Sequence, residues 1–256
     1  MVRSLYTACT GMVHQMNRLD VVTNNMANSD TTAYKKEGST SQSFDSVYGI
    51  KINDSSVNYI HQNIGRMSLG VKVGETYTDY GDGNLEETEQ LYDMALSGKG
   101  FFAISYADRN GNESVRYTRD GNFTVNSQGV LVTKDGDFVL AEDGGLINIP
   151  EGVKISVDES GRITADGQEI AQLQLVDFED YNYLEKFGEN MYIAIDGATT
   201  TDAQCKVYQG YLEASNVNVV TEMVDMITIT RDYESNQKVI QTIDSTLEKS
   251  VALGRI

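Results

Sequence analysis

Residues 5–26, LYTACTGMVHQMNRLDVVTNNM, carry the pattern that decides the fold of this chain. Side chains recur there at alternating intervals of four and three residues, and only one of the recurring residues is polar. These residues are Leu5, Cys9, Met12, Met16, Leu19, Thr23 and Met26. This spacing is typical of the seam of a coiled-coil helix. Gly11 costs roughly 1 kcal/mol of helix stability relative to alanine, which is too little to interrupt the segment.

A second segment of the same kind lies near the other end of the chain. Its seam positions are Val219, Met223, Met226, Thr230, Tyr233, Gln237, Ile240, Asp244, Leu247 and Val251. Each predicted helix has only a narrow apolar stripe, which is too small to stabilise a helix alone in water. Two interpretations follow: the helices pack against copies of the chain in an assembly, or they pair in an antiparallel hairpin within one monomer.

Between the two helices, short β-prone runs alternate with turn signals. The β-prone runs are residues 101–105, 123–125, 130–133, 138–140, 153–157 and 173–178. Dipeptides such as Asp135-Gly136, Asp166-Gly167 and Asp196-Gly197 supply the positive φ angles of tight hairpin turns. The sequence therefore predicts an α+β fold, with a central antiparallel all-β domain of sandwich or barrel type between N- and C-terminal coiled-coil-type helices.

This reading divides the chain into four segments. They are an N-terminal helix in 1–36, an extended connector in 37–74, a β-rich outer domain in 75–214 and a C-terminal helix in 215–256. The connector is rich in Ser, Asn, Gly and Tyr, and its weak pattern assigns no regular element.

Charge and composition exclude several classes of function. The 256 residues carry a net charge of -18, which disfavours nucleic acid as a partner because phosphates require Lys and Arg. Residues 1–36 carry +2 and residues 217–256 carry -2, so the middle of the chain carries all of the excess negative charge. A mean hydropathy of -0.36 without a long apolar run predicts no membrane insertion. The first 28 residues lack the apolar run and cleavage site of a secretory signal peptide.

Motifs that carry catalysis or bind metals are missing from the sequence. It contains no GxSxG nucleophile elbow, no Walker A loop and no dinucleotide fingerprint after a strand. His14 and His61 have no Cys, Asp or second His at ligand spacing, and two cysteines make no disulfide framework. The run Asp108–Asn112 resembles part of a calcium loop, but its glycine is misplaced and Arg119 stands where a Glu should be. We expect no enzyme activity, catalytic residue, cofactor or metal.

Four ordered motifs resemble those of the bacterial flagellar rod and hook proteins, the axial protein family. The first motif, TNNMANSDTTAYKK at residues 23–36, is similar to a family signature that reads A-N-N-L-A-N, two variable residues, then T-x-G-[FY]-K. The other three are residues 83–102, residues 117–133 and QGYLEASNVN at residues 209–218. Ala33 stands where the family usually has Gly, which puts the left-handed turn at that position in doubt.

The resemblance implies a structural subunit of the flagellar basal-body rod that self-assembles into a helical tube and transmits motor torque to the hook. It also implies export by the flagellar type III apparatus without a cleaved signal peptide, with a chaperone as a further partner. Other rod and hook proteins would be the axial neighbours, and the length is closer to distal or proximal rod subunits than to the hook protein. The alternative from a different class is a secreted β-domain module that binds glycan or peptidoglycan.

We expect the subunit interface to use apolar residues of both helical seams and the asparagines at the end of the first helix. The predicted interface residues are Leu5, Met12, Met16, Leu19, Asn24, Asn25, Met26, Asn28, Val219, Met223, Met226, Ile240 and Leu247. Amide side chains both donate and accept hydrogen bonds, so the asparagines would cap the helix and bind neighbouring backbone. Plain termination of the helix explains the asparagines equally well.

Overall fold

The structure, a computed structural model, describes residues 2–52, 61–107, 113–150 and 153–254, and for residues 2, 49–52 and 61–64 the backbone alone. The chain forms two units. Unit 1 comprises residues 1–27, 37–79 and 218–256, and unit 2 comprises residues 28–36 and 80–217.

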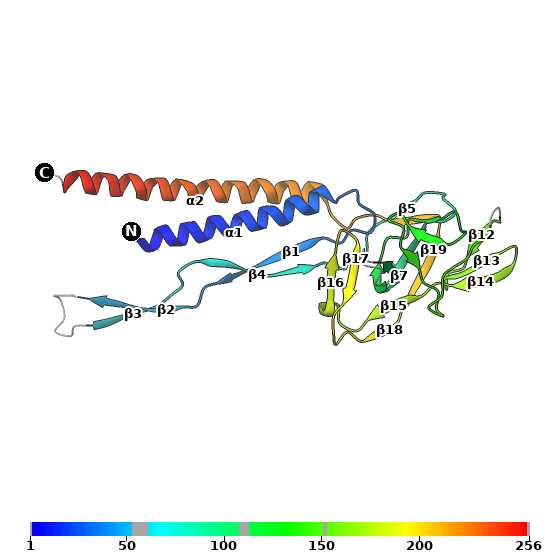
Figure 1. Ribbon diagram of the computed structural model, residues 1–256. Helices are drawn as coiled ribbons and strands as arrows, with labels where there is room; N and C mark the ends of the chain where they lie inside the picture. The colour runs from blue at the N-terminus through cyan, green and yellow to red at the C-terminus, as the bar shows by residue number, and fades with distance from the viewer. Residues whose placement is uncertain (1, 53–60, 108–112, 151–152, 255–256) are drawn as a thin grey trace. The chain divides into compact units, whose positions relative to one another are not determined.

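Two long helices, α1 (Val2–Ala27) and α2 (Val219–Leu253), pack against each other in unit 1. In Figure 1, α1 (blue) and α2 (orange to red) lie side by side and run in opposite directions. At 1.5 Å per residue their 26 and 35 residues span about 39 and 52 Å. Asn218 caps α2, since its side chain accepts a hydrogen bond from the Thr221 N–H.

Residues 37–52 and 61–78 of unit 1 contain two antiparallel ribbons, most of them in the connector 37–74, where the sequence had assigned no regular element. Strand β1 (Glu37–Ser43) pairs with β4 (Val71–Thr78), and β2 (Val47–Ile52) pairs with β3 (His61–Met67). The strand β1, EGSTSQS, has no apolar alternation because neither of its faces is deeply buried. Polar groups join α1 to β1 and to the segment before β4: His14 Nε2 lies 2.8 Å from Ser41 Oγ in β1, and Thr7 Oγ1 donates to Leu69 O at 3.2 Å.

Unit 2 is built on a nine-stranded antiparallel sheet. Strand β7 (Phe101–Ala107) is its hub, because it pairs with three neighbours: β8 (Glu113–Thr118), β11 (Phe138–Val139) and β15 (Leu175–Phe178). The remaining strands of this sheet are β9 (Phe123–Val125), β10 (Leu131–Thr133), β16 (Leu184–Phe187), β17 (Met191–Ala194) and β18 (Thr200–Asp202).

Three smaller sheets and a 3-10 turn complete unit 2. The elements are β12 (Ile155–Val157), β13 (Arg162–Ala165) and β14 (Gln168–Gln172) in one sheet, β6 (Met94–Gly98) with β19 (Cys205–Gln209), β5 (Leu85–Glu87) with β20 (Tyr211–Glu213), and η1 (Tyr181–Tyr183). Two apolar cores lie between these elements. Phe102 and Phe123 belong to the larger core, and Phe101 and Tyr192 belong to an aromatic one.

One tight turn and one close backbone contact show why glycine is required at particular positions. Asp166 and Gly167 join β13 to β14 with φ angles of 50° and 83°, as a hairpin turn with two left-handed residues demands. Gly121 serves another purpose, since a Cβ at that position would lie 1.6 Å from the carbonyl oxygen of Met94. Backbone passes so close to backbone there that no side chain fits.

The predicted α+β fold, with a central antiparallel β domain between terminal helices, is confirmed. The unit boundaries differ from the predicted segments 1–36 and 75–214. Helix α1 ends at Ala27, so residues 28–36 belong to unit 2, while β4 extends to Thr78 and keeps residues 75–79 in unit 1. The turn expected at Asp108–Asn112 lies outside the described residues. In the described part of the chain, neither helix combines the length and apolar character needed to cross a bilayer.

Candidate functional site

The two helices of unit 1 meet in a fixed antiparallel register. Gln15 Nε2 donates to Asp232 Oδ2 at 3.2 Å, and Asn25 Nδ2 donates to Glu222 Oε2 at 3.3 Å. The residue numbers of each pair add to 247, the constant sum that antiparallel helices require. Because α1 begins at Val2, the last two turns of α2, from about residue 246 on, have no part of α1 beside them.

This pairing is the antiparallel hairpin that the sequence left open as one of two interpretations. It accounts for only part of the apolar surface of the helices, as the positions of the predicted interface residues show. Leu5, Met12, Leu19, Met26, Val219, Met226 and Ile240 are partly buried. Met16 is 50% exposed, Met223 is 49% exposed and Leu247 is 39% exposed.

Helix α2 also exposes large apolar side chains that the seam pattern did not include. Val220 is 71% exposed, Val224 58% and Ile227 53%. Ile229, also outside the predicted seam, is buried at 1% exposure. A helix with apolar residues on several sides needs more than one partner in water, and α1 covers only one side. The intervals of four and three residues identified one apolar stripe of α2 and missed the apolar residues on its other sides.

The asparagines at the end of α1 have different environments. Asn25 is 1% exposed and binds the backbone of Glu37 twice: its Nδ2 donates to Glu37 O at 2.8 Å, and its Oδ1 accepts from Glu37 N at 2.9 Å. Asn28 Oδ1 accepts from Thr31 Oγ1 at 3.3 Å, and Asn24 is exposed. The two hydrogen bonds of Asn25 therefore fix the start of β1 beside the end of α1, in the way that paired backbone hydrogen bonds join two β-strands.

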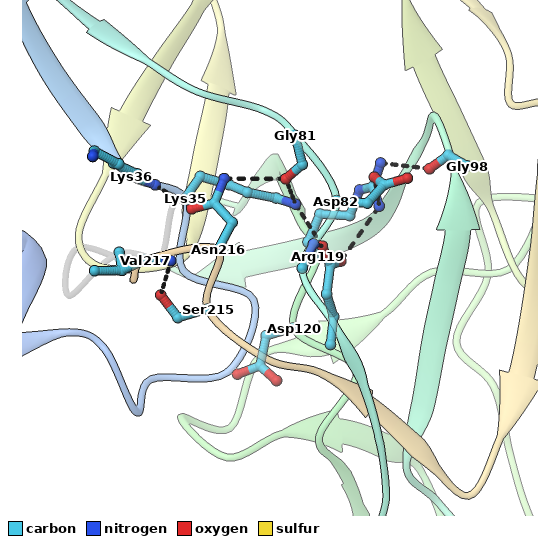
Figure 2. Close-up of polar contacts among 12 residues, drawn as sticks. Lys35, Lys36, Gly81, Asp82, Gly98, Arg119, Asp120, Ser215, Asn216 and Val217 are labelled. Atoms are coloured by element: carbon cyan, nitrogen blue, oxygen red, sulfur yellow. Dashed lines mark hydrogen bonds and ion pairs between the residues drawn. The ribbon is translucent and has the colours of Figure 1, made fainter. Parts of the chain in front are cut away.

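A buried ionic cluster in unit 2, which we call the clamp, joins the first and last sequence motifs. It consists of the buried Lys35, Glu213 and Arg119 and of the exposed Asp82; Figure 2 labels all of these except Glu213. Lys35 and Glu213 form an ion pair with both side chains only 1% exposed, and Lys35 Nζ also donates to Gly81 O at 2.9 Å. The sequence analysis did not select these residues, although Lys35 and Glu213 lie in the two signature motifs.

Arg119 completes the charge balance of the clamp. Its Nη1 lies 3.3 Å from Glu213 Oε2 and 3.4 Å from Asp82 Oδ1, and its Nη2 donates to Gly98 O at 2.6 Å. The Gly83 N–H donates to Glu213 Oε1 at 2.9 Å. Glu213 thus holds two buried cations and a backbone donor. Burial lowers the pKa of Lys35, and the neighbouring Glu213 carboxylate offsets part of that shift.

Backbone hydrogen bonds fasten the same two motifs beside the clamp. The Ala33 N–H donates to Glu213 O at 2.7 Å, the Asn216 N–H donates to Tyr34 O at 3.3 Å, and Lys36 N donates to Asn216 Oδ1 at 2.7 Å. Ala33 has a φ of 56° and is fully buried, so the left-handed turn that was in doubt without glycine does form. The bond to Glu213 holds that conformation, which costs alanine about 1–2 kcal/mol.

The features of this arrangement support binding and packing. The described residues contain no group of three or more His, Cys, Asp or Glu side chains placed to hold a metal ion. The charged groups of the clamp are occupied with one another, and the helices present apolar surface. Both features belong to a protein that holds shape and packs against partners.

Relatives match nearly the whole of this chain, and three family models match separate parts of it. A flagella basal body rod protein model matches residues 5–35, a flagellar hook protein FlgE/F/G D1 domain model matches 95–165, and a flagellar basal body rod FlgEFG protein C-terminal model matches 208–253. The chain is 33% identical to the flagellar basal-body rod protein FlgG of Buchnera aphidicola subsp. Schizaphis graminum, over 97% of this chain and 98% of that protein. The chain belongs to the flagellar basal-body rod protein family.

Relatives from other bacteria agree. The chain is 32% identical to FlgG of Bacillus subtilis over 100% of both chains, and 34% identical to the rod protein FlgF of Caulobacter vibrioides over 98% of this chain and 96% of that one. The chain is therefore a structural subunit of the flagellar basal-body rod, and the family assignment gives no support to a glycan-binding module. Within this rod protein, the clamp joins Lys35, in the N-terminal family match, to Glu213, in the C-terminal one.

Proposed function

We propose that this rod subunit self-assembles into a helical tube that transmits motor torque to the hook. The single observation that carries the proposal is the apolar surface that α2 leaves uncovered, including Val220, Met223 and Val224. In a lone chain these side chains remain in water, and burying each against a neighbour contributes roughly 1.5–3 kcal/mol. Contacts that do not close on themselves generate an open helical array.

In this proposal the predicted segments 1–36 and 215–256 form the inner layer of the tube, 37–74 connects, and 75–214 lies outside. The partners are copies of the chain and other flagellar rod and hook proteins. Delivery is by the flagellar export apparatus, with a chaperone as a further candidate partner. The thirteen predicted interface residues form the contacts within and between subunits.

The clamp lies close in sequence to most of the points where the chain passes from one unit to the other. The chain passes between units after residues 27, 36, 79 and 217. Three of these passages lie within three residues of Lys35, of Gly81, which accepts a hydrogen bond from Lys35, or of Asn216, whose Nδ2 donates to Gly81 O. A subunit under torque must resist being pulled apart where its chain passes between units. We infer that the clamp provides that resistance in unit 2.

Single charges placed on the exposed helix surface test the self-assembly. Met16→Asp and Leu247→Asp should abolish polymers of the purified protein, as measured by sedimentation and electron microscopy, because a carboxylate cannot be buried unpaired in an apolar contact. Both side chains are exposed in the single chain, so circular dichroism should show an intact fold. Asn17→Asp and Gln241→Asp, at exposed polar positions of the same helices, are the matched controls. Normal polymers from both Met16→Asp and Leu247→Asp would overturn the proposal.

Amide hydrogen exchange of the monomer and of the polymer provides a second, independent test of the proposed self-assembly. Amides beyond about residue 246 of α2 should exchange fastest of that helix, because no part of α1 stabilises those turns. Assembly should slow their exchange by at least tenfold. Exchange there that is the same in monomer and polymer would show that the exposed end of α2 is not used in assembly.

A further inference from the structure

One face of α1 meets β1 and the segment before β4 through polar side chains. Thr7 Oγ1 donates to Leu69 O at 3.2 Å, and His14 Nε2 lies 2.8 Å from Ser41 Oγ. Thr7 and His14 are two helical turns apart, so they lie on the same face of α1. Threonine keeps its charge at every ordinary pH, whereas histidine has a pKa near 6.5. His14 is therefore the member of this contact that can respond to a proton.

The imidazole of His14 is enclosed. The residue is only 5% exposed, its Nε2 contacts Ser41 Oγ, and its Nδ1 is buried without a hydrogen-bond partner. A neutral imidazole carries an N–H on one nitrogen, which can be Nε2, but an imidazolium carries an N–H on both. Protonation would therefore place a charge and an unpaired donor in a buried site, and both are unfavourable there.

The charged groups around His14 do not compensate an imidazolium. Arg18, one turn further along α1, has the same sign of charge and opposes protonation. In the antiparallel register, residue 233 of α2 stands opposite His14. The other charged residues of the elements that pack against this part of α1 are Glu37 of β1, Lys72 and Glu75 of β4, and Arg231, Asp232 and Glu234 of α2. Within the part of the chain that the structure describes, none of these groups forms a hydrogen bond or an ion pair with His14.

We propose that His14 and Ser41 form a pH-sensitive latch, which holds the ribbon of β1 and β4 to α1 while His14 is neutral and releases the ribbon when His14 is protonated. Release gives the imidazolium access to water. Ser41 is exposed, and the pairing of β1 with β4 is already irregular between Ser39 and Ser41, so only a small movement is needed. An isolated two-stranded ribbon is marginally stable in water at best, so the released strands lose protection of their backbone hydrogen bonds.

The direction of the pH effect follows from the site. Burial, and then the charge of Arg18, lower the pKa of His14 in the closed latch, whereas the released imidazole has its ordinary pKa of 6.5. Release should therefore be rarest above pH 6.5 and become more frequent as the pH falls. Because one proton is taken up, the change cannot exceed tenfold per pH unit, and it levels off below the pKa of the closed latch.

Native-state hydrogen exchange of the monomer tests the latch, with each rate divided by the intrinsic rate of an unfolded amide at the same pH. Protection at residues 39–43 and 71–76 should be constant above pH 6.5 and fall below it. His14→Gln can still hydrogen-bond to Ser41 Oγ but does not titrate, so its ribbon should keep its protection in acid. His61→Gln removes the other histidine of the sequence and is the matched control, which should behave as the wild type does.

Low concentrations of urea separate release of the ribbon from unfolding of unit 1. The effect of urea on an opening reaction increases with the surface that the opening exposes. In acid, exchange of the ribbon amides should therefore hardly respond to urea, whereas exchange of the most protected amides of α2 should accelerate with it. If both respond equally, His14 acts on the stability of the whole unit and the latch is refuted.

The imidazole itself can be titrated by proton nuclear magnetic resonance, with the two histidines assigned from His14→Gln and His61→Gln. The midpoint of His14 should lie below pH 6.5, and Arg18→Gln should raise it and reduce the effect of acid on the ribbon. This titration and Arg18→Gln decide the matter even if His14→Gln does not fold. A His14 midpoint at or above pH 6.5, or ribbon protection that depends on pH equally in His14→Gln and in the wild type, would overturn the proposal. None of these measurements requires assembly, so failure of the latch leaves the proposed rod function standing.

Discussion

Replacing Lys35 by Met tests whether the clamp stabilises unit 2. The change removes a hydrogen bond to Gly81 O and the ion pair with Glu213, while Glu213 keeps Arg119 at 3.3 Å and the Gly83 N–H at 2.9 Å. Breaking a buried ion pair by removing one partner costs about 3–5 kcal/mol. Because Glu213 retains two donors, we expect Lys35→Met to lower the free energy of unfolding by about 3 kcal/mol, the lower end of that range.

Glu213→Gln should be worse than Lys35→Met. It removes the one carboxylate shared by Lys35 and Arg119 and leaves two buried cations, which are 1% and 3% exposed, with only the half-exposed Asp82 to balance them. We expect a loss of about 5 kcal/mol, the upper end of the same range. The double variant should cost less than the two single changes added together, by at least about 1 kcal/mol, since both residues belong to one network.

The assay is urea unfolding of the monomer, followed by tyrosine fluorescence and far-ultraviolet circular dichroism. The chain has 15 Tyr and no Trp, so the fluorescence reports on several parts of unit 2, including the buried Tyr34 and Tyr192. Lys206→Met is the matched control. It breaks the Lys206–Glu159 pair, whose side chains are 60% and 61% exposed, and should leave the urea midpoint unchanged. A loss below about 0.5 kcal/mol for Lys35→Met, or additivity in the double variant, would refute the reasoning.

Two further predictions concern a backbone contact and a buried histidine. Gly121→Ala should destabilise unit 2 by about 3 kcal/mol, because the new Cβ would collide with the Met94 carbonyl. Gly145→Ala is the control and should be tolerated, because a Cβ at that position would have nothing within 4 Å. Equal urea midpoints for the two variants would contradict the packing argument. The pKa of His14 is lowered, first by burial and then by Arg18, so the unfolded chain binds the proton more readily than the folded one. This contribution to the free energy of unfolding of unit 1 should therefore be complete above pH 6.5 and should decrease as the pH falls below that value. His14→Gln should remove this part of the pH dependence. If the free energy of unfolding from urea titrations changes with pH equally in His14→Gln and in the wild type, the prediction is wrong.

Local signals in the sequence were enough for the helices and for most turns of the β domain. In a helix with an apolar seam, the period of 3.5 residues can be seen directly in the sequence. A pair such as Asp166-Gly167 specifies its turn through backbone sterics alone. Neither signal depends on distant parts of the chain. For that reason the fold class followed from the sequence before any tertiary contact was known.

The connector and the clamp depend on contacts that leave no local pattern. Strand β1 is polar on both faces and pairs with β4 some 35 residues later, as the bond between Thr40 and Glu75 shows, so it lacks the alternation that marks a half-buried strand. Lys35 and Glu213 are 178 residues apart. One lysine and one glutamate at that separation look like any two charged residues until the chain brings them together.

The sequence also did not decide which face of α2 packs against α1, and the reason is different. Apolar residues occupy several sides of this helix, so one period fits Val219, Met223 and Met226 while another fits the buried Ile229. Sequence periodicity can rank stripes but cannot decide which of them meets α1 and which is left for another chain. The thirteen predicted interface residues stay a prediction for that reason.

The distribution of charge between the units bears on how copies can pack. From the sequence, unit 1 carries a net charge of -3 and unit 2 carries -15. The unit with the most uncovered apolar surface is therefore also the unit that repels a copy least. Unit 2 has the opposite problem, since neighbouring β units would repel one another over a Debye length of about 10 Å at 0.1 M salt.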